Sequence, residues 1–224
     1  MIKAVIFDLW ETIVPTTIDF VHLKSLTEKN GLPVEEFVER YERSAQLGKF
    51  DSLETLRAGF LKAFPGMDEE FLESAFYEVW ANRFDKVYFY PEAEKTLLKL
   101  RSEGYKVVLL SNTESFKAKE VEKKLNFRKY FDSIFYSFEI GAVKPDKAAF
   151  NAVLNGLKLK PEECLMVGDS LRSDIFGANS VGMRTCRIVR SLSRVRNEHF
   201  GVKPDYVIGS LDEIFKILGE LNKK

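Results

Sequence analysis

The sequence predicts an α/β protein with a doubly wound, mostly parallel Rossmann-like sheet and an inserted α-helical subdomain. Three observations support this fold class. Ala4–Phe7 is a continuous apolar run, as expected of a strand buried on both faces in a parallel sheet. From Pro91 onward, similar short runs alternate with helical patterns, which is typical of a doubly wound sheet. The stretch between these two parts carries helical patterns alone.

Size and charge narrow the possible functions. The chain has 224 residues, enough for a substantial core, and its 34 basic and 34 acidic residues give no net charge. No global field therefore favours nucleic acid or an anionic membrane. No apolar run approaches the ~18 residues of a membrane span, and the N-terminus lacks a signal-peptide pattern. We expect a soluble, cytoplasmic monomer or homodimer in which Cys164 and Cys186 are buried thiols.

The expected domain division is a catalytic core formed by residues 1–14 and 91–224 and a helical cap formed by residues 15–90. Four helices are predicted in the cap: one around residues 21–26 that stops at Asn30-Gly31, one from Pro33 to near Gly48, one over residues 53–64, and one over residues 71–80. The run Asp51-Ser-Leu-Glu54 resembles a capping box for the third helix, and Asp68 can cap the fourth. The cap aromatics fall at core spacing, so we expect them to pack.

The core is expected to continue in βα alternation with right-handed crossovers. The predicted strands cover residues 106–110, 134–136, 164–167, 185–189 and 206–208. The predicted helices cover residues 92–102, 116–125, a segment from Asp146 to about Leu157, a segment that ends at Gly182, and a segment from Leu211. Arg190, Arg194 and Arg196 make one loop basic, and we expect this loop to be a solvated surface feature.

Polar residues collect where apolar strands end, at the edge at which open parallel sheets bind ligands. Asp8 follows the first strand, Ser111-Asn112 the second, and Asp169 a later one, with Asp174 shortly after; Lys144 precedes a helix between the last two. Three convergent carboxylates repel unless a cation or a proton intervenes. Mg²⁺ prefers oxygen ligands and retains waters that a phosphate can replace. The set therefore predicts an anion site with a built-in carboxylate nucleophile. The sequence shows no Ser-His pair, P-loop or Cys-rich metal motif.

This ordered set resembles the haloacid dehalogenase superfamily over essentially the whole chain. The resemblance rests on four motifs in order: Phe7-Asp8-Leu-Trp-Glu-Thr12, Leu110-Ser111-Asn112, Val143-Lys144-Pro145-Asp146, and Val167-Gly168-Asp169-Ser170 followed by Asp174 and Gly177-Ala178. Helices between the first and second motifs resemble one of the family's cap types. The resemblance implies that the cap closes over the site, excludes water and selects the substrate.

The resemblance also implies a role for each motif residue. Asp8 is implied to be the nucleophile that carries an aspartyl-phosphate. The implied Mg²⁺ ligands are Asp8, the backbone carbonyl of Trp10, Asp169, and Asp174 or its water. The residues implied to bind the phosphoryl group are Thr12, Ser111, Asn112 and Lys144. The implied partner is a small phosphorylated metabolite.

One position departs from the family pattern. Phosphatases of this family usually have a second Asp, a general acid and base, two residues after the nucleophile, and here that residue is Trp10. The dehalogenase branch carries an aromatic residue at this position but lacks the metal acids, which are intact here. A Mg²⁺-dependent phosphatase, slow on alkyl phosphates, is therefore favoured.

Three alternatives stay open: a 2-haloacid dehalogenase, a low-turnover phosphate-binding module, and a phosphonate hydrolase that uses a cap lysine such as Lys49. Four cations of the cap are candidates for contact with an anionic substrate, but we expect them to be solvated helix or loop charges; they are Arg40, Arg43, Lys49 and Arg57.

Overall fold

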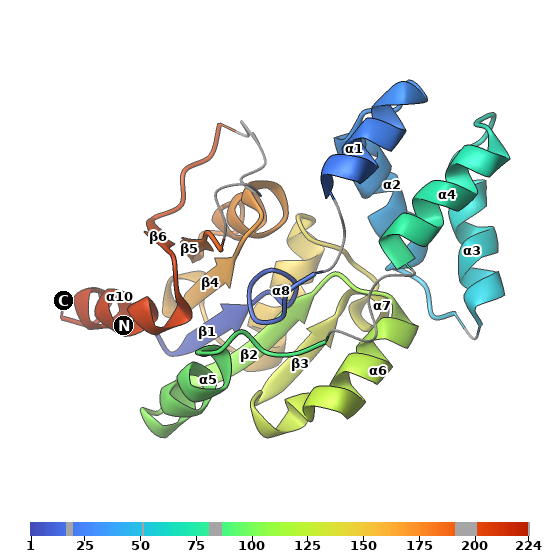
Figure 1. The fold of residues 1–224 in the computed structure, drawn as a ribbon. Coiled ribbons are helices and arrows are strands. Elements are labelled where there is room, and N and C mark those ends of the chain that lie inside the picture. Colours follow the sequence, from blue (N-terminus) through green and yellow to red (C-terminus); the bar gives the residue numbers. More distant parts are fainter. Residues whose placement is uncertain (17–19, 51, 81–86, 191–200, 224) are drawn as a thin grey trace.

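The computed structural model describes residues 1–16, 20–50, 52–80, 87–190 and 201–223 (Figure 1). Its centre is a six-stranded sheet in the order β3-β2-β1-β4-β5-β6, and every neighbouring pair is parallel. The strands are β1 (Ala4–Phe7), β2 (Lys106–Ser111), β3 (Ser133–Tyr136), β4 (Cys164–Gly168), β5 (Arg184–Ile188) and β6 (Tyr206–Ile208). The predicted α/β fold class is confirmed.

Helices cover both faces of this sheet. Side chains alternate along each strand, so Val5 and Phe7 face one layer while Ala4 and Ile6 face the other. The first layer comprises α5 (Ala93–Ser102), α6 (Ser115–Leu125) and α10 (Ile214–Leu221), and the second is built mainly on α8 (Lys147–Leu157). Burial on both faces explains why the strands are continuous apolar runs.

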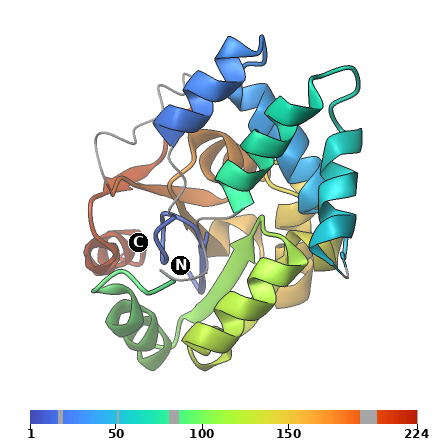
Figure 2. The ribbon, with the colours of Figure 1, turned by 45° about the vertical axis from the view of Figure 1, so that its right-hand side comes forward.

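Four further helices form a unit of their own beyond the sheet. They are α1 (Phe20–Lys29), α2 (Val34–Ala45), α3 (Leu53–Lys62) and α4 (Glu69–Trp80). Figures 1 and 2 show them standing over the end of the sheet toward which the strands point. Their apolar residues form a separate buried cluster in which Phe60 lies 4.9 Å from Phe64 and 5.2 Å from Phe76 between ring centroids. The prediction that these aromatics pack is confirmed.

Several local predictions need correction. The capping box of α3 consists of Ser52 and Thr55, because the Ser52 hydroxyl accepts from the Thr55 amide while the Thr55 hydroxyl accepts from the Ser52 amide. Asp51, with which the predicted box began, lies outside the described residues. The single helix expected before Gly182 is a π-helical turn, Leu171–Phe176, followed by the short α9, Gly177–Asn179.

The remaining observations concern two short helical elements, the cysteines and the lengths of the helices. The C-terminal segment begins with a 3₁₀ turn at Leu211–Glu213, and the short helix α7 (Ser137–Ile140) has no periodicity that predicts it. Cys164 and Cys186 are free and buried, as predicted. Within the described residues, no helix combines the length and apolar character that crossing a bilayer requires.

Candidate active site

The candidate site lies beside β1 and β4, where the order in which the strands are added to the sheet reverses. From β1 the chain proceeds through β2 to β3 on one side, and then places β4, β5 and β6 on the other. Phe7 pairs in register with Val167 of β4, so Asp8 and Asp169 leave neighbouring strands at nearly the same level. A switch point of this kind is where open α/β sheets bind ligands.

Lys144 joins the acidic residues of this edge. Its ammonium lies 2.6 Å from Asp8 Oδ1 and 2.6 Å from Asp174 Oδ1, and the side chains of all three are largely buried. The side chain of Asn112 holds the Lys144 backbone on both sides: its Nδ2 donates to the carbonyl at 2.9 Å, and its Oδ1 accepts from the amide at 2.8 Å. Asn112 thereby fixes the lysine, and a phosphate contact of Asn112 stays a prediction.

Asp174 reaches the site because of the backbone around it. It lies in the π-helical turn after β4, where its Oδ2 accepts from the Ser170 amide at 3.1 Å. A Cβ on Gly168 would lie 2.2 Å from Asp174 Oδ2, so only glycine leaves room for the carboxylate. This close approach explains why Gly168 precedes Asp169 in the fourth motif.

The donor set suits a hard divalent cation. Asp8, Asp169 and Asp174 each offer a carboxylate oxygen, and these oxygens lie within 4.8 Å of one another. Three carboxylates and one lysine leave a net negative charge in a largely buried place, which one Mg²⁺ would compensate. The residues present therefore fit Mg²⁺; the part assigned to the Trp10 carbonyl stays a prediction.

Burial dominates the proton affinity of the nucleophile candidate. Burial raises the pKa of Asp8 to about 6; Lys144 opposes the rise and the negative charge of Asp174 adds to it. Burial by itself would lower the pKa of Lys144, but the charges and hydrogen bonds of Asp174 and Asp8 outweigh it and raise that pKa. Lys144 is therefore a permanent cation, whereas Asp8 changes charge in a physiologically accessible range.

Three buried hydroxyl groups at the ends of β1 and β2 have no hydrogen-bond partner among the described residues. Thr12 and Ser111 are fully buried, and neither side-chain oxygen has a hydrogen-bond partner among the described residues. Thr113, two residues after Ser111, has the same character. Because buried polar groups are almost always hydrogen-bonded, hydroxyls without a partner at the ends of β1 and β2 and in the loops that follow are consistent with a site that receives an anion.

Trp10 leads to a second buried polar cluster, which we call the junction cluster and which consists of Tyr41, Gln46, Glu114 and Lys117. Lys117 lies 3.2 Å from Glu114 Oε2 and 5.3 Å from the centre of the Trp10 ring, and both charged side chains are 1% exposed. Tyr41 and Gln46, from the helical unit, both donate to Glu114 Oε1. Sequence reasoning missed this cluster, because Glu114 and Lys117 at i,i+3 resemble an ordinary solvated helix pair.

The helical unit is also tied to the site loops by ion pairs. Arg43 makes two contacts, of 3.1 and 3.0 Å, with Asp146. Arg172 lies 2.9 Å from Glu39. The other cations considered for substrate binding are Arg40, which pairs with Glu36, Arg57, which pairs with Glu73, and Lys49, which is exposed. Of this set, Arg43 departs from the expected solvated helix charge, because it bridges two parts of the molecule.

Arg190 corrects the prediction of a solvated basic loop. Its side chain is only 10% exposed, and it binds the carboxylate of Glu92 and the backbone carbonyl of Thr12. Arg194 and Arg196, the other two cations of that loop, lie outside the described residues.

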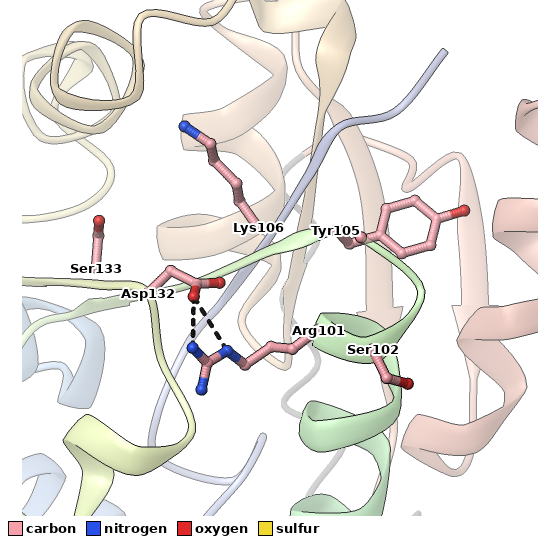
Figure 3. Close-up of a pocket in the computed structure, with 7 residues that line it drawn as sticks. Arg101, Ser102, Tyr105, Lys106, Asp132 and Ser133 are labelled. Carbon is pink, nitrogen blue, oxygen red and sulfur yellow. Dashed lines mark hydrogen bonds and ion pairs between the residues drawn. The ribbon is translucent and has the colours of Figure 1, made fainter.

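A pocket of about 590 Å³ lies at the opposite edge of the sheet, beside the first residues of β2 and β3 (Figure 3). In this pocket the guanidinium of Arg101 points at Asp132 and pairs with it at 2.8 Å. Asp132 also accepts from the Val107 amide at 2.8 Å. These two charged residues pair with each other and bind the backbone at the beginning of β2, so we assign no catalytic function to this pocket.

Comparison with known proteins agrees with this geometry. A model of the haloacid dehalogenase-like hydrolases matches residues 2–182. Over 99% of its length, the chain is 30% identical to the glyceraldehyde 3-phosphate phosphatase of Pyrococcus furiosus, 95% of which is covered. The enzyme of the same name from Methanopyrus kandleri is 29% identical over the full length of both chains.

Solved structures show the same arrangement. A HAD phosphatase from Thermococcus onnurineus is 30% identical, with a TM-score of 0.64 over 97% of this chain and 98% of that one. The L-2-haloacid dehalogenase of Xanthobacter autotrophicus has a TM-score of 0.65 over 98% of this chain and 99% of that one at 19% identity, a likeness of fold alone.

Proposed function

The chain belongs to the haloacid dehalogenase-like hydrolase family, and on that basis we propose that it is a Mg²⁺-dependent phosphatase of small phosphorylated metabolites. The observation that carries the proposal is the convergence of Asp8, Asp169 and Asp174 within 4.8 Å around Lys144. A dehalogenase needs no metal, and nothing in its chemistry accounts for three convergent acids whose mutual repulsion a divalent cation would relieve.

In this proposal Asp8 is the nucleophile. One of its carboxylate oxygens attacks phosphorus, and the bond from phosphorus to the substrate oxygen breaks; that oxygen leaves with the bonding electrons and takes a proton from solvent, while an aspartyl-phosphate forms. Water then attacks this phosphorus and gives up a proton to solvent, the bond between phosphorus and the Asp8 oxygen breaks, and inorganic phosphate and free Asp8 result. Asp8, Asp169, Asp174 and the Trp10 carbonyl would hold Mg²⁺, which when bound neutralises charge on the transferring phosphoryl group.

The other motif residues bind the phosphoryl group. The Lys144 ammonium offers a buried positive charge, and Thr12 and Ser111 each offer a buried hydroxyl that has no partner among the described residues. These groups are already in place before the reaction, so they stabilise developing charge without reorganisation. Asn112 keeps Lys144 in position through its two backbone hydrogen bonds.

We assign residues 15–90 to a cap that selects the substrate over a core of residues 1–14 and 91–224. Its helix α2 lies against the site loops through Arg43–Asp146 and Arg172–Glu39. The similarity to glyceraldehyde 3-phosphate phosphatases covers the cap as well as the core, so a short phosphorylated sugar is the first substrate to test.

Haloacid dehalogenation is the second candidate, favoured by Trp10 alone. An indole has no titratable group, so it neither protonates a leaving alkoxide nor activates water. An aromatic residue at this position instead suits carbon–halogen chemistry, in which the leaving halide needs no proton.

The experiment compares both activities in the same preparation. Phosphate release from glyceraldehyde 3-phosphate and an aryl phosphate, and chloride release from 2-chloropropionate, are measured with Mg²⁺ and with EDTA. We expect Mg²⁺-dependent phosphate release that Asp174→Asn reduces by on the order of 10² or more, because the metal contributes several kcal/mol. Asp132→Asn, which alters an arginine-paired acid at the opposite sheet edge, is the matched control.

Full phosphatase activity in EDTA, or equal losses in the two variants, would contradict the proposal. Chloride release without metal would instead establish the dehalogenase.

A further inference from the structure

Arg190 occupies an unusual place directly after β5. Its guanidinium is in contact with three groups: the carboxylate of Glu92, the backbone carbonyl of Thr12, and the ring of Tyr90, whose centre lies 3.8 Å away. Ion pair, carbonyl hydrogen bond and ring stacking together use the charge, the donor fork and the flat face of arginine, which lysine cannot reproduce.

These partners lie on the two chain connections between core and cap. Thr12 belongs to the connection that leaves β1, and Tyr90 and Glu92 belong to the connection that returns from α4. Burial raises the pKa of Glu92, but hydrogen bonds from Arg190 and from backbone amides outweigh burial, and the net pKa is lowered. Glu92 is therefore a stable anion opposite Arg190.

The two connections also bind each other directly. The Tyr90 amide donates to the carbonyl of Ile13 at 3.0 Å, and the Tyr90 hydroxyl lies 3.2 Å from Glu11 Oε2. The other oxygen of Glu11 accepts from the Thr16 amide. Glu11 has a left-handed backbone with φ of 60°, which non-glycine residues keep only where surrounding contacts enforce it. We call Glu11, Thr12, Tyr90, Glu92 and Arg190 together the hinge clasp.

We propose that Arg190 is a positioning residue for phosphoryl transfer: it locks both cap connections onto the Thr12 loop and so holds the Thr12 hydroxyl in place. This inference rests on the proposed function. Thr12 is fully buried, its hydroxyl has no partner among the described residues, and its carbonyl is held by Arg190. In the proposed function the Thr12 hydroxyl binds the phosphoryl group. Motion of the Thr12 backbone would therefore displace this hydroxyl from the position that transfer requires.

The proposal predicts a particular kinetic signature. Arg190 lies behind the loop, in contact with backbone and cap connections, so its loss should affect the transition state more than substrate capture. In Arg190→Ala we expect kcat to fall about 10- to 100-fold, the scale of a charge-assisted hydrogen bond, while KM changes by less than about threefold. Guanidinium ion added below denaturing concentration should restore part of kcat.

Arg101→Ala is the matched control, because Arg101 also makes an ion pair and a hydrogen bond to a backbone carbonyl, far from the site. Arg101 pairs with Asp132 (Figure 3) and donates to the Lys129 carbonyl at 2.6 Å. Both contacts lie beside the first residues of β2 and β3, whereas Asp8 follows the last residue of β1. Both variants and wild type are compared for kcat and KM on an aryl phosphate with Mg²⁺, with and without guanidinium. Amide hydrogen exchange of residues 9–16 and 90–92 is measured in the metal-free proteins.

Faster exchange in both segments in Arg190→Ala but not in Arg101→Ala, together with the kcat loss and its rescue, would support the proposal. Unchanged kcat in folded Arg190→Ala, or an equal loss in Arg101→Ala, would overturn it. If Arg190→Ala does not fold, Arg190→Lys takes its place: it keeps a charge near Glu92 but should still lose kcat, and wild-type kcat in this variant would overturn the proposal. A wild type without phosphatase activity would refute the proposed function, while the exchange comparison would still test the clasp.

Discussion

Two buried lysines, Lys144 and Lys117, lie in clusters of opposite design. Lys144 bridges Asp8 and Asp174, with Asp169 close by, so three carboxylates face one cation. Lys117 faces one carboxylate, Glu114, whose other oxygen accepts hydrogen bonds from Tyr41 and Gln46. The first cluster carries excess negative charge, whereas the second pairs one lysine with one glutamate.

This difference separates a ligand site from a structural one. A buried charge is tolerated best when an opposite charge lies beside it, and in the junction cluster Lys117 and Glu114 supply each other's opposite charge. In the cluster of Asp8, Asp169, Asp174 and Lys144 the carboxylates outnumber the cation, and a divalent cation would compensate the excess. The balance of charge, rather than burial alone, therefore distinguishes the two clusters.

The largest effect is expected from Asp8→Asn, which removes the nucleophile from the unbalanced cluster. Because an amide neither attacks phosphorus nor ligates Mg²⁺ well, turnover should fall by at least about 10³-fold. The fold should persist, because an amide is less costly to bury than an unpaired carboxylate. Phosphate release and a thermal melt on the same preparation measure both results. A folded variant that retained a few per cent of the activity would remove Asp8 from its role.

In the junction cluster we expect a substitution to reduce the stability of the protein. Glu114→Ala leaves Lys117 buried without its carboxylate, so the free energy of unfolding should fall by about 3–5 kcal/mol. The double variant Glu114→Leu/Lys117→Met, which removes both charges, should recover most of that loss. Urea unfolding of the wild type and both variants makes the comparison. If the single variant were as stable as wild type, the junction cluster would not be structural.

Much of the fold was predictable because it depends on local patterns. A strand buried on both faces must be apolar throughout, so Ala4–Phe7 and Cys164–Gly168 stand out from the surrounding helices. Polar residues directly after such strands must share one sheet edge, so a meeting of Asp8 and Asp169 was foreseeable. The π-helical turn at Leu171–Phe176 was not, because its register is set by the close approach of Asp174 to Gly168.

The contacts that the sequence concealed are those between segments far apart in the chain. In the sequence, Arg190 stands at the start of a basic stretch that is typical of a solvated loop. Its burial depends on contacts with Glu92 and Thr12, which lie about 100 and 180 residues away in the chain. Glu114 belongs to the junction cluster because Tyr41 and Gln46 of the helical unit donate hydrogen bonds to its carboxylate. Neither helical periodicity nor charge spacing carries that information, because both depend on neighbours within a few residues.

A smaller effect should appear in the pH dependence of metal binding. The pKa of Asp8, raised to about 6, means that this carboxyl is protonated below that pH in the metal-free protein and ionised above it. Mg²⁺ must displace the proton, so its apparent affinity should fall about tenfold per unit as pH drops below 6 and level off above it. Calorimetric titration of the wild type with Mg²⁺ between pH 5 and 8 would measure this, and a flat profile would contradict it.

The same pKa sets the sign of a stability effect. Because the pKa of Asp8 in the folded protein lies above the ordinary aspartate value of 3.8, ionisation of Asp8 reduces the stability of the metal-free fold as pH rises from about 4 to about 6. Asp8→Asn has no such ionisation. Its melting temperature relative to metal-free wild type should therefore increase across that window and stay constant above it.

The smallest expected effect concerns Trp10, where the two clusters meet. If the enzyme lacks a general acid, its rate should depend strongly on the leaving group: aryl phosphates leave as weakly basic anions, whereas alkyl phosphates leave as strongly basic alkoxides that need a proton. Trp10→Asp should then raise kcat/KM for an alkyl phosphate relative to an aryl phosphate by about tenfold or more, a fraction of the ~10²–10⁴-fold that general acids contribute.

The indole also packs against Lys117, and removal of a packed Trp costs about 3–5 kcal/mol of stability, so the same ratio is measured in Trp10→Asn as the control. Asn has the size and polarity of Asp but no acidic proton. A shift in Trp10→Asp that Trp10→Asn lacks would identify proton donation at this position. An unchanged ratio in a folded, Mg²⁺-binding Trp10→Asp would mean that another group, from the cap side of the junction, already protonates the leaving oxygen. In that case the junction cluster would belong to the catalytic site, and the contrast between the two clusters would no longer hold.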